Sequence, residues 1–276
     1  ENCSMVRDIV VNLGLGARDP AGVYAISVAE AFEAHVFGAA VSYEPVIPGD
    51  TLGGVAPETF GVQYRESENK ARAAIGRFEE AAKREGLSYE TRILTTSIQG
   101  AADQLGRIGR HFDLIVLGQP EKKTPNDVID EAVLFESGRP VILVPFIQEG
   151  GMTLDRVMVC WDGSRAAARA VGDALPFLKK AKQVEIVIVS DKPNKKDEIP
   201  GADLGQHLAR HGLKVEIEQM TSHIDVASTI LSYAADSNAD MIVMGGYGHS
   251  RLREFVLGGA TRSMLESMTV PVLMSH

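Results

Sequence analysis

The sequence predicts an α/β protein made of two tandem, doubly wound, mainly parallel five-stranded sheets flanked by helices. Short runs rich in Val, Ile and Met alternate with segments of helical periodicity. The runs are largely uninterrupted by polar residues, which is typical of parallel strands buried on both faces. The pattern also occurs twice, since Asp113–Gly118 matches Asp240–Gly245 in character at every position. We therefore expect one domain at 1–148 and a second at 152–276.

Each half supplies enough strands for its own sheet. Helices are expected between the strands, because parallel neighbours need a crossover connection. The apolar stripe of Val226, Ile230 and Ala234 is typical of a helix lying on a sheet. The predicted strands are 7–13, 35–43, 89–95, 113–118, 140–145, 155–161, 184–190, 214–221, 240–245 and 270–274, and the predicted helices are 66–85, 166–179, 202–211, 226–235 and 261–268. The Pro- and Gly-bearing stretch 44–62 is expected to be a loop insertion.

Composition and charge narrow the function classes. The net charge of −9 disfavours nucleic acids and anionic membranes as partners. No apolar run reaches the roughly 20 residues of a membrane helix, and no signal peptide opens the sequence, so a cytoplasmic location is expected. Cys3 and Cys160 are too few for a disulfide framework, and Cys160 is expected to be a small buried residue.

A glycine-rich loop follows the fourth strand of the second half. Gly245 and Gly248 allow close approach of a ligand to the backbone. After nine further residues, Gly258 and Gly259 precede a helix whose free N–H groups can hold phosphate oxygens. Thr261 offers a hydroxyl donor or a helix cap. Since ligands of doubly wound sheets bind at the carboxyl ends of the strands, this loop is the predicted phosphate site.

The motif Gly245-x-x-Gly248, nine residues, Gly258 resembles the ATP-binding signature of the universal stress protein family. The resemblance is strong over 155–276 and weaker over 7–145. It implies the adenine nucleotide alpha hydrolase-like fold and a stress-response protein that binds ATP, with an accompanying Mg²⁺. It further implies that Asp162 lies near the nucleoside and that Val189 lies beside adenine.

The resemblance has two departures. Gly259 stands where family members usually have Ser or Thr, so one hydroxyl bond to phosphate is lost, which weakens binding by roughly tenfold. The first half carries Gly118-Gln-Pro-Glu121 in place of the glycine loop, and Asn12 stands where the family has its Asp, so the first site is expected to be degenerate. The resemblance also implies pairing of strands 141–144 and 270–274 into an internal pseudo-dimer, and leaves a homodimer open.

Three functions remain open on the sequence. A regulatory, non-catalytic nucleotide-binding protein is favoured. A slow ATPase using the same pocket lacks a Walker-type lysine. A nucleotide-free interaction module is the third.

Two further sets of residues are considered as candidates for catalysis or metal binding. One is the pair His207 and His211, four residues apart without a third metal ligand, and the other is the trio Asp162, Ser164 and His249. Arg251 and Arg253 place positive charge in the loop.

Overall fold

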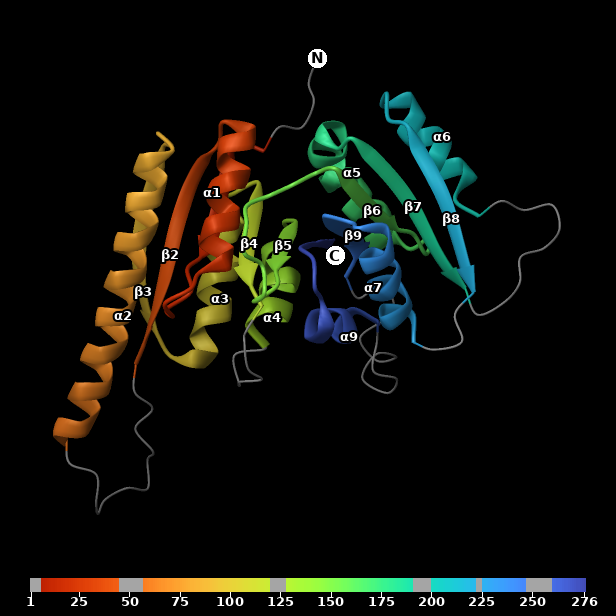
Figure 1. The fold of residues 1–276 in the computed structure, drawn as a ribbon. Coiled ribbons are helices and arrows are strands. Elements are labelled where there is room, and N and C mark those ends of the chain that lie inside the picture. The colour runs from red at the N-terminus through yellow and green to blue at the C-terminus, as the bar shows by residue number, and fades with distance from the viewer. Residues whose placement is uncertain (1–5, 45–56, 120–127, 191–199, 222–224, 247–259) are drawn as a thin grey trace. The chain divides into compact units, whose positions relative to one another are not determined.

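The computed structural model describes residues 6–44, 57–119, 128–190, 200–221, 225–246 and 260–276 (Figure 1). Residue contacts divide the chain into two units. The N-terminal unit comprises 6–139 and 149–151, and the C-terminal unit comprises 140–148 and 152–276. The last strand of the first half therefore groups with the second unit. The proposed domain limits of 1–148 and 152–276 stay a prediction.

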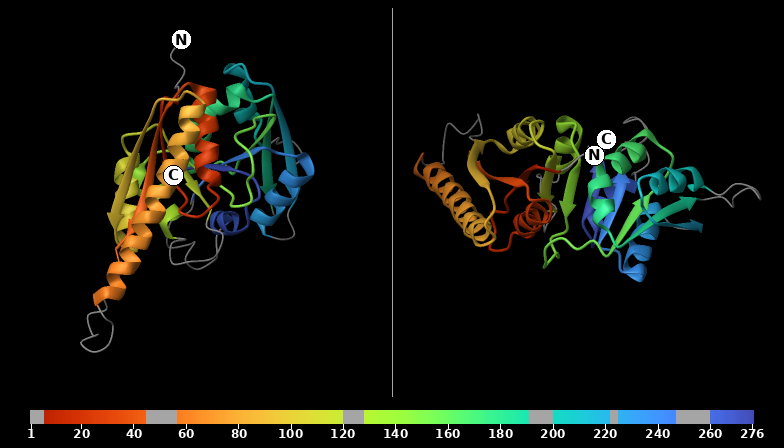
Figure 2. Two further views of the ribbon diagram at one scale, coloured as in Figure 1. Left: turned by 60° about the vertical axis from the view of Figure 1, so that its left-hand side comes forward. Right: turned by 90° about the horizontal axis from the view of Figure 1, so that it is seen from above.

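The N-terminal unit has four parallel strands in the order β3-β2-β1-β4. Helices lie on both faces of this sheet (Figure 2). The chain leaves β1 toward β2 on one side and returns to β4 on the other, so the winding direction reverses between β1 and β4. The elements are β1 (Asp8–Asn12), α1 (Pro20–Phe32), β2 (His35–Tyr43), α2 (Pro57–Arg84), β3 (Tyr89–Thr96), α3 (Ile98–Gly109), β4 (Leu114–Gly118) and α4 (Val128–Ser137).

The C-terminal unit repeats this winding in the order β8-β7-β6-β9-β10 and adds β5 beyond β10. All pairs are parallel except β10 with β5, where Leu273 faces Ile142 in antiparallel register. This is the strand pairing that the family resemblance implies. The elements are β5 (Val141–Val144), β6 (Arg156–Cys160), α5 (Arg165–Lys180), β7 (Gln183–Ser190), α6 (Ala202–Arg210), β8 (Val215–Thr221), α7 (Val226–Ser237), β9 (Met241–Gly245), α9 (Ala260–Ser267) and β10 (Val272–Ser275).

The central strands form the core of each unit, and the predicted α/β fold class is confirmed. The middle three residues of β1 and of β6 are buried, as are all four residues of β5 and β10. Asp113 and Asp240 perform the same task in the two units. Each carboxylate accepts a backbone N–H at the start of the adjacent first strand, from Asp8 at 3.1 Å and from Arg156 at 2.7 Å. The Asp that begins each copy of the repeat therefore has the same structural role in both units.

One predicted boundary is wrong. Helix α2 begins at Pro57, nine residues before the expected start at Glu66, so the expected loop over 44–62 is helical from Pro57 onward. Proline suits the first turn of a helix, because its fixed φ is helical and the N–H it lacks would have no intrahelical partner. Positions 45–56 of that stretch lie outside the described residues. Pro57 marks the beginning of the helix rather than the interior of a loop.

Candidate functional site

The carboxyl ends of β7, β6 and β9 lie side by side in the C-terminal unit. Strand β6 pairs with β7 on one side and with β9 on the other. A hydrogen bond from Trp161 N to Val187 O, 2.9 Å long, extends the β6–β7 pairing one residue past β6. The chain continues from β6 into β7 and reaches β9 only later, so the reversal of strand order falls between β6 and β9. This is the position where doubly wound sheets form a ligand crevice.

Asp162 lies at this edge on a tight connection between β6 and α5. Its side chain is exposed, and its Oδ1 accepts the N–H of Ser164 at 2.9 Å. Gly163 has a φ of 74°, which favours glycine. Ser164 Oγ then accepts the N–H of Ala167 at 3.1 Å and caps α5. The structure thus gives Ser164 a structural role at the helix end and leaves the Asp162 carboxylate exposed at the carboxyl edge of the sheet.

Val189 is the next-to-last residue of β7. Its side chain is half-buried, and its register partner on β8 is Met220. Because β6 and β7 are parallel neighbours, Val189 and Asp162 both lie at the carboxyl edge of the sheet. A half-buried aliphatic residue at that edge has apolar surface available to a flat ring.

Gly245 ends β9, and the structure supplies a packing reason for it. A Cβ at this position would lie 2.4 Å from Ala167 N and 2.6 Å from the carbonyl carbon of Ala166. The first turn of α5 therefore occupies the space that any side chain would need. Gly246 N donates to Ser275 O at 2.9 Å, which ties the end of β9 to β10. The glycine is required by helix–strand packing whether or not phosphate binds here.

Thr261 is the second residue of α9 and is only 5% exposed. It lies inside the helix, so it is not the residue that caps it. Gly248, Gly258 and Gly259, together with His249, Arg251 and Arg253, lie outside the described residues. Of the predicted phosphate loop, the structure therefore describes only its two ends.

The strand register matches the residues of the two units differently from the sequence comparison. Asn12 is the last residue of β1 and faces Ala39, just as Cys160 ends β6 and faces Val187. This register makes Asn12 the counterpart of Cys160, and it places Gly14 opposite Asp162. The alignment of Asn12 with the family Asp is corrected accordingly. Pro120 and Glu121 lie outside the described residues.

The remaining candidates do not form a catalytic or metal centre where the chain is described. The rings of His207 and His211 stack edge to face with centroids 4.8 Å apart. Within the described ranges, no group of three His, Cys, Asp or Glu side chains is placed to hold a metal ion. Cys160 is half-buried rather than fully buried as expected. Burial, followed by the nearby Asp162 carboxylate, raises the pKa of its thiol to about 12, which disfavours the nucleophilic thiolate at neutral pH.

Strand order defines both units as doubly wound α/β domains. The family model described as the universal stress protein family matches residues 153–276. These residues form a universal stress protein domain, and the chain as a whole shares the fold of universal stress protein structures.

One sequence relative and two solved structures are similar to this chain. The chain is 28% identical over 170 residues to universal stress protein Slr1230 of Synechocystis sp., an alignment covering 59% of this chain and 57% of the relative. The chain therefore spans little more than half the length of that relative. A universal stress protein from Archaeoglobus fulgidus has a TM-score of 0.75 at 17% identity, covering 98% of this chain and 96% of that one. A Pseudomonas aeruginosa protein of unknown function has a TM-score of 0.61 at 16% identity, covering 98% and 92%.

No helix in the described part of the chain combines the length and apolar character needed to cross a bilayer.

Proposed function

We propose that the C-terminal unit binds an adenine nucleotide, ATP or a close relative, at the carboxyl ends of β6, β7 and β9. The observation that carries this proposal is the placement of Asp162. Its exposed carboxylate stands at the reversal of strand order, within a domain that the universal stress protein model matches. In such a crevice a carboxylate can accept hydrogen bonds from ribose hydroxyls, and backbone N–H groups can hold phosphate.

The proposed roles follow from position for Asp162, Val189, Gly245 and Thr261, and from the glycine motif for the remaining glycines. Asp162 would accept from the nucleoside, and Val189 would pack on the adenine ring. Gly245, Gly248, Gly258 and Gly259 would offer backbone N–H groups to phosphate, and Thr261 would support the first turn of α9. Mg²⁺ would accompany ATP through its phosphates and water, since magnesium is usually held by one or two carboxylates plus substrate phosphates.

The proposed role is regulatory rather than catalytic. Ser164, the nearest hydroxyl to Asp162 in sequence, is engaged in capping α5, and the Cys160 thiol stays protonated at neutral pH. A nucleotide-dependent change in the protein would then be read by a partner. An internal pseudo-dimer of the two halves, a homodimer of chains and a cytoplasmic location belong to the same proposal.

Equilibrium binding of ATP with Mg²⁺ tests the proposal, using the wild type, Gly248→Val and Asp162→Asn. The Asn side chain keeps an acceptor for Ser164 N, so the β6–α5 connection is retained while the charge is lost. Asp236→Asn, an exposed position on α7, is the matched control. We expect saturable binding that is lost with Gly248→Val and weakened about tenfold with Asp162→Asn, as for one hydrogen bond to a charged group. Absence of binding to the wild type at millimolar ATP would refute the proposal.

A further inference from the structure

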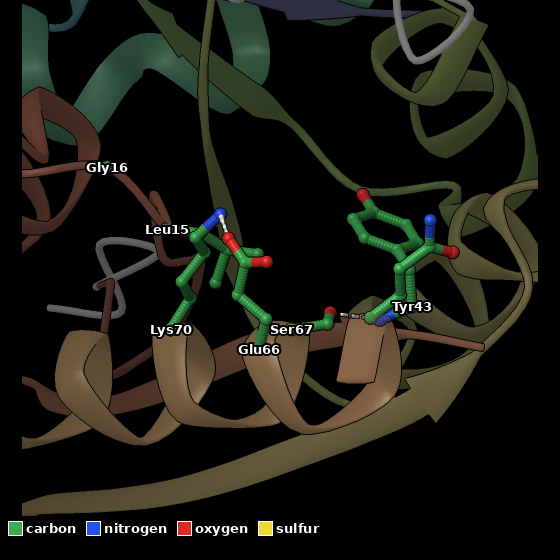
Figure 3. A pocket seen from close by; sticks show the side chains of 7 residues that line it. Leu15, Gly16, Tyr43, Glu66, Ser67 and Lys70 are labelled. Atoms are coloured by element: carbon green, nitrogen blue, oxygen red, sulfur yellow. Dashed lines mark hydrogen bonds and ion pairs between the residues drawn. The ribbon is translucent and has the colours of Figure 1, made fainter. Parts of the chain in front are cut away.

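The N-terminal unit contains a cavity of about 500 Å³ at its own carboxyl edge, where the resemblance had implied only a degenerate site. This volume is within the range of small-molecule pockets. Figure 3 shows the charged pair of α2 on one side of the space and the ring of Tyr43 on the other. The lining residues come from the β1–α1 connection, the end of β2 and one face of α2, and are Leu15, Gly16, Tyr43, Gln63, Glu66, Ser67 and Lys70.

Two features found in this unit and not in its counterpart build the cavity. The connection from β1 to α1 runs over 13–19, whereas that from β6 to α5 runs only over 161–164. The longer connection provides Leu15 and Gly16. Helix α2 has 28 residues and α6 has 9, and all four helical lining residues lie in the first half of α2. The cavity is thus an elaboration of the duplicated frame.

Hydrogen bonds fix both walls of the cavity to α2. Arg77 Nη2 donates to Gly14 O at 3.3 Å and to Gly16 O at 2.6 Å, which holds the β1–α1 connection against the helix. Tyr43 N donates to Ser67 Oγ at 2.8 Å, which holds the end of β2. These bonds preform the cavity, and a preformed site lowers the ordering cost of binding.

The charge on the lining selects a class of ligand. Lys70 Nζ lies 2.7 Å from Glu66 Oε1, and these are the only charged side chains among the seven lining residues. The lining is therefore neutral as a whole, and a polyphosphate would meet one ammonium that a carboxylate already neutralises. A ligand that carries both an ammonium and a carboxylate would complement the pair. The Leu15 side chain and the Tyr43 ring supply apolar surface for a flat or aliphatic body.

We propose that the N-terminal unit binds a zwitterionic small molecule of the aromatic α-amino-acid class in this cavity. The ligand carboxylate pairs with Lys70, its ammonium pairs with Glu66, and its ring packs on Tyr43 and Leu15. The site is separate from the nucleotide site proposed for the C-terminal unit. The two proposals rest on different residues and fail independently.

Three probes that share the indole ring system and differ in charge test the ligand class. They are zwitterionic L-tryptophan, cationic tryptamine and anionic indole-3-propionate. Binding to the full chain is followed by saturation-transfer NMR of the probe and by calorimetry. We expect L-tryptophan to bind saturably, with a dissociation constant of about 1 mM for a ligand of this size. Tryptamine and indole-3-propionate each lose one exposed charge contact, so each should bind about two- to fivefold more weakly. No binding of L-tryptophan, equal binding of all three, or tightest binding of the anion would overturn the proposal.

Two variants locate the site. Lys70→Met removes the ammonium and should weaken L-tryptophan about two- to fivefold, whereas tryptamine, which loses a like-charged neighbour, should bind no more weakly. Its matched control is Arg72→Met, since Arg72 forms the same kind of pair with Glu68 on the same helix but does not line the cavity. Leu15→Trp fills the cavity and should abolish binding of all three probes. Unchanged L-tryptophan binding in Lys70→Met and Leu15→Trp would place the probe elsewhere and refute the site.

Discussion

The two units use the same strand order and differ most at the carboxyl edge of the sheet. In the C-terminal unit the β6–α5 connection is short, and Asp162 stands exposed on it. In the N-terminal unit the equivalent connection is longer, and Arg77 clamps it to α2. The strand order is therefore the same in the two units, whereas the connections at the carboxyl edge differ, as expected for surface loops on a rigid frame.

A second difference lies inside the sheets. The register makes Glu185 on β7 the counterpart of Phe37 on β2. Glu185 is 4% exposed, and it accepts the Tyr233 hydroxyl at 2.5 Å and lies 3.7 Å from Arg156 Nη1. Phe37 packs on the ring of Phe112, with centroids 5.5 Å apart. One unit therefore fills this position with a partnered carboxylate and the other with an aromatic ring.

The largest effect is expected from the glycines that end β9 and β4. A methyl group at Gly245 collides with backbone atoms of α5 at 2.4 and 2.6 Å, whereas at Gly118 its nearest contact is Ala21 Cβ at 3.3 Å. We expect Gly245→Ala to lower the free energy of unfolding by about 3 kcal/mol and Gly118→Ala by less than about 1 kcal/mol. Urea unfolding checks this, with Trp161 fluorescence for the C-terminal unit and circular dichroism for the whole chain. Equal costs would show that the two strand ends pack alike.

Tyr233→Phe is expected to have the next largest effect. The substitution removes the hydroxyl donor from a buried carboxylate, which should cost about 1–3 kcal/mol of unfolding free energy. The double variant Glu185→Leu/Tyr233→Phe should recover part of that loss, because an apolar side chain occupies the same position in the first unit. Denaturant unfolding followed by Trp161 fluorescence measures both. A double variant less stable than Tyr233→Phe alone would contradict this account of Glu185.

A pH-dependent difference is expected between the two helix caps. Asp19 Oδ1 accepts the N–H of Gly22 at 3.0 Å and caps α1, as Ser164 caps α5. Burial raises the pKa of Asp19 above its usual 3.8, although hydrogen bonds from Gly22 and Gly14 and the charge of Arg77 act in the opposite direction. A raised pKa in the folded state means that ionisation above that pKa favours unfolding.

Asp19→Asn keeps the cap and removes the charge, so its melting temperature relative to wild type should rise as the pH increases from about 3 to about 7. Ser164→Asn is the control, because neither the serine nor the asparagine side chain ionises in this pH range. A relative melting temperature of Asp19→Asn that stays flat with pH would contradict the raised pKa, and one that falls would show that the folded state stabilises the carboxylate.

The sequence predicts the fold of the C-terminal unit closely, because apolar runs such as Val157–Val159 and the repeat around Asp240 depend on local patterns. It predicts less of the N-terminal unit. Pro57 reads equally well as a loop or as a helix start, and only packing decides. The cavity near Tyr43 is invisible in the sequence, because its walls are distant in the chain and joined by Arg77 and Ser67. Because the β1–α1 connection is longer than the β6–α5 connection, the sequence comparison matches Asn12 with Asp162. The strand register shows that Asn12 corresponds to Cys160.

The last prediction concerns the position shared by Cys160 and Asn12 and is read as a reaction rate rather than as a stability. In the part of the chain that the structure describes, Asn12 Oδ1 is buried without a hydrogen-bond partner, whereas Cys160 fills its position with a weakly polar thiol. Because its pKa is raised to about 12, Cys160 in a Cys3→Ser background should react with iodoacetamide at least about a hundredfold more slowly at pH near 8 than in the unfolded chain. Asp162→Asn should accelerate the reaction slightly, since the Asp162 carboxylate is the second cause of the raised pKa. Equal rates in folded and unfolded protein would mean that Cys160 is open to the crevice beside Asp162.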